Sequence, residues 1–187
     1  MYRKNLKEEH YTLKARQDKY PARSVYKLQQ IDEKFNLFRK NFKILDLGCA
    51  PGSWLLYSAK KGNVLGIDLR DVNIKLPQNV KFIKMDINEF KTNEKFDIII
   101  SDMAPNTSGE HDIDVENSIE LCEKTLEIAK TNLKRGGNFL CKIFEGEGVQ
   151  EFFKKIEQSF SFAKRYKPLA SRKESREIYI IGKNFRI

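Results

Sequence analysis

A glycine-rich stretch, ILDLGCAPGSW at residues 44–54, has the residue types of a loop that binds a nucleotide-like cofactor. Its apolar start is typical of a buried strand, and Gly48 and Gly52 then allow the backbone to approach a ligand closely. A second apolar run ends near Asp68, 20 positions after Gly48, where a carboxylate can accept both hydroxyls of a ribose. NAD and S-adenosylmethionine share that ribose, and the glycines do not follow the G-x-G-x-x-G spacing of a dinucleotide fingerprint. The loop therefore leaves the choice between these cofactors open.

Four other polar residues stand where the surrounding sequence is apolar or where a strand begins or ends. Lys142 lies inside the apolar run NFLCKIF, where a lysine is rare unless its amine reaches a cleft. Asp102 follows FDIIIS, Lys27 lies at the edge of the apolar face of a helix, and Glu177 opens the last strand. Each of them alone is more often a surface or ion-pair residue. As a set of amines and carboxylates, they are candidates for handling a proton.

The elements that must position these residues alternate along the chain. Apolar and β-branched runs predict strands at 44–47, 63–69, 79–84, 96–101, 138–144, 160–166 and 177–185. Helical spacing predicts helices at 22–38, 54–59, 118–133 and 149–156; glycines 136 and 137 stop the third of these, and 103–114 is expected to be a loop. Two consecutive strands at the end predict a doubly wound, mainly parallel α/β sheet with one strand antiparallel.

Ligands of such sheets bind at the carboxyl ends of the strands, where this chain places further acidic residues. Asp46 ends the first predicted strand. Asp86 follows the third, where it can accept a hydrogen bond from an adenine amino group or cap the next turn.

The charge balance favours a polyanionic partner. The 187 residues contain 35 Lys and Arg against 26 Asp and Glu, a formal net charge of +9. Residues 1–19 interleave basic residues with Tyr2 and Tyr11, and residues 164–176 hold six basic residues and one acidic residue. Both segments suit phosphate contacts, although a solvated terminus explains the first equally well. We expect residues 1–19 to form a basic extension and residues 20–187 to form one domain.

Cysteine usage and hydropathy indicate a reducing, soluble setting. Cys49, Cys122 and Cys141 form no CxxC pair and have no zinc-ligand spacing, so we expect free, buried thiols and no metal site. No apolar run approaches the roughly 20 residues of a membrane span. We therefore expect an intracellular protein without membrane contact, working as a monomer, whose compartment is not resolved. The residues before Tyr20 are also consistent with the end of a targeting segment.

With DLGCAPGSW, SDMAPNTSG, CKIFEGEG and SREIYI in this order, the chain from about Tyr20 onward resembles the FtsJ/RrmJ family of S-adenosylmethionine-dependent RNA ribose 2′-O-methyltransferases. The resemblance implies a seven-stranded class I methyltransferase sheet, RNA as the partner and S-adenosylmethionine as the cofactor. Two positions depart from the family pattern. Cys49 stands where bacterial members usually have alanine, and Ser53 replaces the second glycine of a PGGW motif. Both are small, so we expect the loop to survive.

The resemblance also assigns roles. It implies a catalytic tetrad of Lys27, Asp102, Lys142 and Glu177, and a cofactor set of Gly48, Gly52, Ser53, Trp54, Asp68 at the ribose, Asp86 at the adenine and Asp102 near the methionine end. GEGVQEFF and SREIYI are closer to the branch that acts on a uridine of large-subunit ribosomal RNA than to the tRNA branch.

A 2′-hydroxyl is a weak acid, so its proton must be taken or the developing oxyanion stabilised. We expect Lys142 to act as the general base or as an ammonium beside the alkoxide, with Asp102 orienting its amine and with Lys27 and Glu177 fixing substrate and base. The alternatives are the same chemistry on tRNA or an mRNA cap, an inactive RNA-binding module, and an NAD-dependent oxidoreductase. The last offers no task for Lys142 and Glu177.

Overall fold

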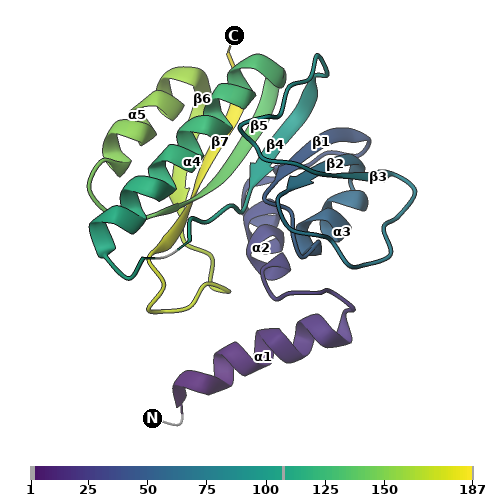
Figure 1. Cartoon of the computed structure of the whole chain (residues 1–187), viewed down its shortest axis with the longest axis vertical. Coiled ribbons are helices and arrows are strands. Elements are labelled where there is room, and N and C mark those ends of the chain that lie inside the picture. Colours follow the sequence, from purple (N-terminus) through teal and green to yellow (C-terminus); the bar gives the residue numbers. More distant parts are fainter. Residues whose placement is uncertain (1–2, 107, 187) are drawn as a thin grey trace.

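Seven strands form one mixed sheet in the computed structural model of the protein, which describes residues 3–106 and 108–186 (Figure 1). The strands are β1 (Phe42–Leu47), β2 (Gly62–Asp68), β3 (Val80–Lys84), β4 (Phe96–Ser101), β5 (Leu133–Phe144), β6 (Phe160–Tyr166) and β7 (Glu177–Phe185), in the spatial order β3-β2-β1-β4-β5-β7-β6. β7 is antiparallel to both of its neighbours, and the other neighbouring pairs are parallel. The predicted doubly wound sheet with its last strand antiparallel is confirmed.

Helices cover both faces of this sheet. α2 (Val25–Phe35) and α3 (Ser53–Ala59) lie on one face, where their apolar side chains pack with Ile44, Ile98 and Leu140. α4 (His111–Asn132) and α5 (Val149–Ser159) cover the other, where their apolar residues pack with those strand residues that alternate with the first set. Each strand between two helical layers is therefore apolar on both faces, which explains the continuous run FDIIIS of β4.

The order of the strands places a ligand crevice next to β1. β1 lies between β2 and β4, so the chain leaves β1 toward one edge of the sheet and returns on the other side. In doubly wound sheets the crevice at such a switch point, outside the carboxyl ends of the strands, is where ligands bind. The glycine-rich loop that follows β1 lies at this point.

Two predicted boundaries around α4 are wrong. α4 begins at His111 rather than 118, because its first two turns are polar and carry no apolar pattern; Asp112 and Asp114 in its first turn suit the positive end of the helix dipole. The helix ends at Asn132, and β5 begins at Leu133, so the glycines expected to stop the helix lie inside the strand instead. α2 is also shorter than predicted, because Asn36 ends it in a left-handed conformation.

The first segment is a helix, α1 (Arg3–Gln17), although its sequence shows little apolar periodicity. Contacts of its last turns with α2 hold it: Ala15 is buried, the rings of Tyr11 and Tyr26 lie 5.4 Å apart, and the Tyr26 hydroxyl donates to Asp18 at 2.8 Å. Figure 1 shows α1 at the end of the molecule next to α2. Tyr2, expected to contact nucleic acid, lies outside the described residues, and Tyr11 packs against the protein itself.

The three cysteines are free and buried, as expected. Among the described residues, no helix is long and apolar enough to cross a membrane.

Candidate active site

Lys142 and Asp102 meet at the carboxyl ends of β4 and β5. The Lys142 Nζ lies 2.6 Å from the Asp102 backbone carbonyl oxygen and 3.1 Å from its Oδ1. Both side chains are largely buried, with exposed fractions of 9% and 18%. Burial raises the strength of this pairing over that of a surface ion pair, because little water competes for the charges. The amine is therefore held in one position at the cofactor edge of the sheet.

A second lysine–carboxylate pair joins α2 to β7. The Lys27 Nζ forms an ion pair with the Glu177 carboxylate, and both side chains are nearly buried. Lys27 belongs to the buried face of α2, which explains how a charged residue takes part in an apolar helix face: its amine reaches a partner rather than solvent.

The strand register brings the two pairs onto one face of the sheet. Lys142 lies directly opposite Tyr179 in the β5–β7 pairing, and Glu177 precedes Tyr179 by two residues. Residues two apart on a strand, and residues directly opposite each other, share a face. Tyr179 packs into the core under α2 and α3, so Lys142 and Glu177 lie on the α2 side, where Lys27 also lies. The four predicted tetrad residues therefore converge.

Tyr179 is a positioning residue that the sequence did not single out. Its side chain is fully buried, and its hydroxyl donates to the Asp102 Oδ1 at 2.9 Å, the same oxygen that Lys142 contacts. Burial raises the pKa of the Tyr179 hydroxyl, and the neighbouring Asp102 and Glu177 raise it further, so the group stays a donor. A buried tyrosine two positions after Glu177, on the same face, was the available signal.

The loop after β1 is shaped by its two predicted glycines. Gly48 and Gly52 both have positive φ, 75° and 106°, a region that L side chains rarely adopt. A Cβ on Gly48 would also lie 2.4 Å from the Met103 Cγ. The main chain of this loop and the segment after β4 therefore lie closer together than any side chain at position 48 would permit.

Asp68 closes the same loop from β2. It is buried at the end of the strand, and its Oδ2 and Oδ1 accept hydrogen bonds from the backbone N–H groups of Ala50 (2.7 Å) and Arg70 (2.8 Å). Each carboxylate oxygen has a second lone pair, so Asp68 can still accept from ribose hydroxyls. The residue thus fixes the loop and remains able to bind a ligand.

Ser53 and Trp54, predicted to bind cofactor, face the segment before α2. The Ser53 hydroxyl accepts from the Ala22 N–H at 2.7 Å and donates to the Ala22 carbonyl at 3.0 Å. The Trp54 indole N–H donates to the Ser24 carbonyl at 3.0 Å. Both side chains are buried, so they connect the cofactor loop to the start of the helix that carries Lys27.

Asp86 lies apart from the other predicted residues, at the end of β3. It is half-buried, and its Oδ1 accepts from the Asn88 N–H at 2.8 Å, which is the turn-capping alternative that the sequence left open. This hydrogen bond uses only the Oδ1 of Asp86, so its Oδ2 is available to a ligand.

Asp46 is the least expected carboxylate of the site. It is fully buried, neither of its oxygens has a hydrogen-bond partner among the described residues, and it lies on the same face as Ile44 and hence as Lys142. Burial raises its pKa well above the usual range, and the charges of Asp102 and Asp68 raise it further. Three carboxylates therefore share the crevice beside β1.

This acidic crevice distinguishes the two cofactors that the loop left open. The charges of Asp68 and Asp102 attract a cation and repel the diphosphate of NAD. S-adenosylmethionine carries a sulfonium and an ammonium group, and its ribose can use Asp68. The residues present therefore fit S-adenosylmethionine: Asp68 for the ribose, the loop from Gly48 to Gly52 for the main-chain contacts, and Asp102 for the positively charged end, while Asp46, whose pKa is raised, adds a buried neutral carboxyl.

The environment of Lys142 leaves one position on its nitrogen for a substrate. An ammonium has three hydrogens, of which Asp102 accepts two, and the third can stabilise an oxyanion. A neutral amine donates its two hydrogens to the same two acceptors and keeps its lone pair for a proton. In both protonation states the fourth position of the Nζ is available to a hydroxyl of the substrate.

The chain is similar in sequence to known proteins. The sequence model for FtsJ-like methyltransferases matches residues 20–185. The chain is 44% identical to the ribosomal RNA large subunit methyltransferase E of Desulfatibacillum aliphaticivorans, with 96% of this chain and 91% of the relative covered. It is 45% identical to the protein of the same name from Desulforapulum autotrophicum, over 96% of this chain and 94% of that one.

Solved structures show the same fold. A crystal structure of a ribosomal RNA methyltransferase from Plasmodium falciparum superposes with a TM-score of 0.78 at 30% identity, covering 89% of this chain and 98% of that one. Human methyltransferase-like protein 13, in complex with SAH, reaches a TM-score of 0.56 at 11% identity over 76% of this chain and 72% of the other, which is similarity of fold alone.

Proposed function

Because the chain belongs to the family of FtsJ-like methyltransferases, we propose that it transfers the methyl group of S-adenosylmethionine to a ribose 2′-hydroxyl of RNA in the large ribosomal subunit. The observation that carries this proposal is the Lys142 amine, held by two acceptors of Asp102 beside the acidic crevice. It supplies a proton-handling group where a methyl donor would meet a hydroxyl.

When bound, S-adenosylmethionine supplies an electrophilic methyl group on a cationic sulfur. The task of the protein is then alignment and charge. Asp68 and the loop from Gly48 to Gly52 would hold the nucleoside part, while the low exposure of Asp102 keeps water from screening its attraction for a positive charge.

Lys142 handles the proton of the 2′-hydroxyl at its Nζ. As a neutral amine it accepts that proton, and as an ammonium it stabilises the alkoxide; Asp102 orients it in either case, and the Tyr179 hydroxyl fixes the Asp102 carboxylate. Lys27 cannot move freely, because Glu177 holds it, so it offers a fixed positive charge to the ribose or the adjacent phosphate.

The proposed target rests on the relatives and on charge. Relatives that are 44% and 45% identical to the chain are named for the large ribosomal subunit. The basic loop 167–176 joins β6 to β7 directly before Glu177, so its charges adjoin the tetrad end of the sheet. The expected nucleotide is a uridine.

All four tetrad residues come from one chain, which supports a monomer acting inside the cell, where ribosomal RNA is made.

The test is transfer of a labelled methyl group from S-adenosylmethionine to separated tRNA, small-subunit and large-subunit RNA, with and without ribosomal proteins. A 2′-O-methyl group blocks alkaline cleavage of the adjacent phosphodiester, so alkali-resistant label locates the nucleotide. We expect resistant label in large-subunit RNA. Label in tRNA alone would contradict the proposed target, and label lost with alkali would contradict ribose methylation. Calorimetry with NAD, expected to show no binding, tests the oxidoreductase alternative.

A further inference from the structure

A basic pocket lies at the edge of the sheet opposite the tetrad. It encloses about 270 Å³ between the α2–β1 connection, the start of β4, the start of β5 and the end of β7. Arg39, Lys134, Arg135 and Lys183 line it, against a single carboxylate, Asp97. The lining therefore carries three more positive than negative charges, which suits an anion.

The two arginines are the groups free to bind. Lys134 forms an ion pair with Asp97 at 2.8 Å, and Lys183 donates to the Phe35 carbonyl at 2.7 Å. Arg39 and Arg135 are exposed and have no partner among the described residues. A guanidinium offers a planar fork of donors that matches a phosphate group. Two such forks at one pocket indicate a phosphate ligand rather than internal ion pairing.

Hydrogen bonds between distant segments hold the pocket in shape. The Asn138 side chain donates to the Leu37 carbonyl at 2.7 Å and accepts from the Asn184 N–H at 3.4 Å. The Asp97 Oδ2 also accepts from the Lys43 N–H at 2.7 Å. These contacts tie together four parts of the chain, so the walls are formed before any ligand arrives.

An aromatic shelf adjoins the pocket. A second hollow, lined by Lys34, Phe35 and Phe162, shares Lys183 with the first. The ring of Phe35 lies 6.2 Å from that of Phe162 and 5.3 Å from that of Tyr166. Phe162 is 41% exposed, which is unusual for a phenylalanine. An exposed ring beside unpaired arginines is the combination by which proteins hold single-stranded nucleic acid: phosphates on the cations, bases on the rings.

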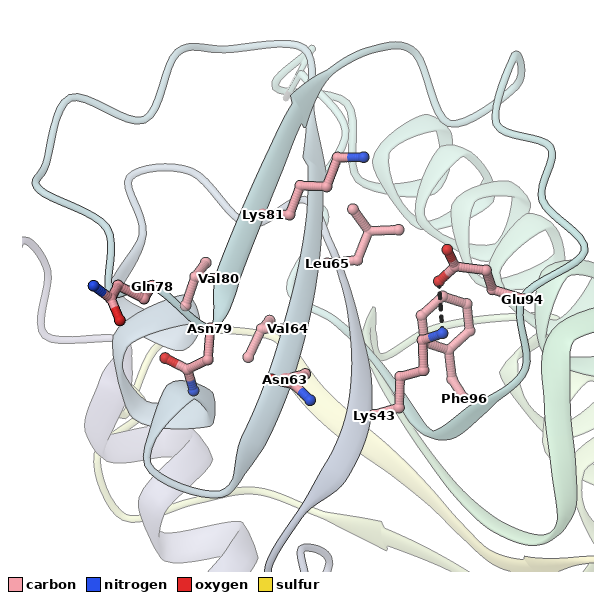
Figure 2. A pocket seen from close by; sticks show the side chains of 10 residues that line it. All are labelled: Lys43, Asn63, Val64, Leu65, Gln78, Asn79, Val80, Lys81, Glu94 and Phe96. Carbon is pink, nitrogen blue, oxygen red and sulfur yellow. Dashed lines mark ion pairs between the residues drawn. The ribbon is translucent and has the colours of Figure 1, made fainter.

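The helix α2 connects this surface with the tetrad. Lys27 lies in its first turn, and Lys34 and Phe35 lie in its last, about 10 Å further along at 1.5 Å per residue. A single strand of RNA that follows α2 therefore reaches from the aromatic shelf to Lys27 within a few nucleotides. Another hollow at the same edge of the sheet, between β1, β2 and β3, is different in charge (Figure 2). There Lys43 is paired with Glu94 at 2.8 Å, and Lys81 is the remaining cation.

We propose that the basic pocket and the aromatic shelf bind single-stranded RNA several nucleotides away from the target nucleotide, with phosphates at Arg39 and Arg135 and a base against Phe162. This inference rests on the proposed function for its choice of RNA as the polyanion. It makes this surface a substrate-holding site separate from the tetrad, so it affects RNA affinity and not the chemical step.

The test measures binding of a labelled single-stranded RNA of about twelve nucleotides by fluorescence anisotropy over a series of salt concentrations. For Arg39→Ala/Arg135→Ala we expect affinity to fall about tenfold and the slope of log K against log salt to become shallower by about 1.4, since each lost phosphate contact on a single strand contributes about 0.7. Methyl transfer at saturating RNA and the affinity for S-adenosylmethionine should equal those of the wild type.

The matched control is Lys81→Ala/Lys154→Ala, which removes the same charge from the other hollow and from α5, where Lys154 is exposed. An equal loss of affinity in this control would overturn the inference, because net charge alone would then account for the effect. An unchanged affinity in the arginine variant would also overturn it.

A second variant tests the shelf. Phe162→Ala should weaken RNA binding about tenfold with an unchanged salt slope, and Phe162→Trp should retain it. Poly-glutamate and poly-uridine serve as competitors for the labelled RNA. If poly-glutamate displaces the RNA to the same extent as poly-uridine, RNA is not the ligand of this surface. If the wild type binds RNA through these residues but methylates no RNA, the proposed function fails and the present inference stands.

Discussion

Lys142 combines two demands that conflict at most buried lysines. Its amine must be fixed, which its contacts of 2.6 and 3.1 Å with Asp102 achieve, and it must still reach a substrate, which its fourth tetrahedral position permits. The same amine accepts a proton if it is neutral and stabilises an anion if it is an ammonium.

Lys142→Arg separates these roles. Arginine keeps the positive charge but cannot lose a proton, so a general base would be eliminated while an electrostatic contact is largely kept. We expect single-turnover methylation to fall about 10²- to 10⁴-fold and its pH dependence to flatten. The control is Lys155→Arg, which changes an exposed lysine paired with Glu123. A variant with nearly the full rate would rule out the general base and leave the ammonium role.

Asp46 makes the stability of the native state depend on pH in an unusual direction. Burial and its two acidic neighbours raise its pKa in the native state, so the folded protein binds its proton more tightly than the unfolded chain does. The contribution of Asp46 to the free energy of unfolding is therefore lost as the pH rises from the unfolded pKa of about 3.9 toward the native value. A salt-bridged aspartate, whose native pKa is lowered, shows the opposite dependence on pH.

Asp46→Asn removes this dependence. We expect the free energy of unfolding of the variant to be close to that of the wild type near pH 4 and to exceed it increasingly toward pH 8, as measured by urea denaturation across the range. Glu89→Gln, which changes an exposed carboxylate, should give a constant difference. A constant difference for Asp46→Asn as well would mean that Asp46 is ionised in both states.

At the scale of elements, the cofactor loop and α2 act as one unit. Ser53 and Trp54 hydrogen-bond to the backbone directly before α2, and α2 carries Lys27 to Glu177. The loop that would hold the methyl donor therefore also determines where one half of the tetrad lies. Ser53 and Trp54 therefore fix the cofactor loop relative to α2, in addition to any direct contact with the cofactor.

Ser53→Ala tests this coupling. The substitution leaves the half-buried Ala22 N–H without its partner, so we expect a loss of about 0.5–1.5 kcal/mol in the free energy of unfolding, together with weaker binding of S-adenosylmethionine in calorimetry. Ser58→Ala in the same helix is the matched control: that hydroxyl is buried without a partner among the described residues, so its removal should be neutral or stabilising. Equal effects of the two substitutions would refute the coupling.

The elements differ in how far the sequence could predict them. β4, β6 and β7 have the predicted bounds, because a strand buried on one or both faces has an apolar pattern of its own. α1 and the first turns of α4 were missed, because neither shows a clear amphipathic pattern: tertiary contacts hold α1, and the acidic first turn of α4 suits the helix dipole. The tetrad was named from motifs, and the contact of Asp102 with Lys142 was expected. The pairing of Lys27 with Glu177 was not, since these residues meet only through the packing of the folded chain.

The molecule as a whole separates its charges. It carries a net charge of +9, with unpaired basic groups such as Arg39 and Arg135 on the surface, while the carboxylates of Asp68 and Asp102 lie buried or nearly buried at the cofactor crevice. The exterior thus attracts a polyanion and the crevice attracts a cation. Because the exterior charges are solvated and the crevice is not, salt should act on the two ligands very differently.

The two affinities should therefore respond differently to salt between about 50 and 200 mM. Binding of large-subunit RNA, measured by filter retention, should weaken by at least tenfold, because each phosphate contact releases condensed counterions. Binding of S-adenosylmethionine, measured by calorimetry, should change less than about twofold, because buried carboxylates are poorly screened. S-adenosylhomocysteine, which lacks the sulfonium charge, serves as the control and should be equally insensitive. A loss of S-adenosylmethionine affinity as steep as that of RNA would place the carboxylates in bulk water and contradict the acidic crevice as the site of the methyl donor.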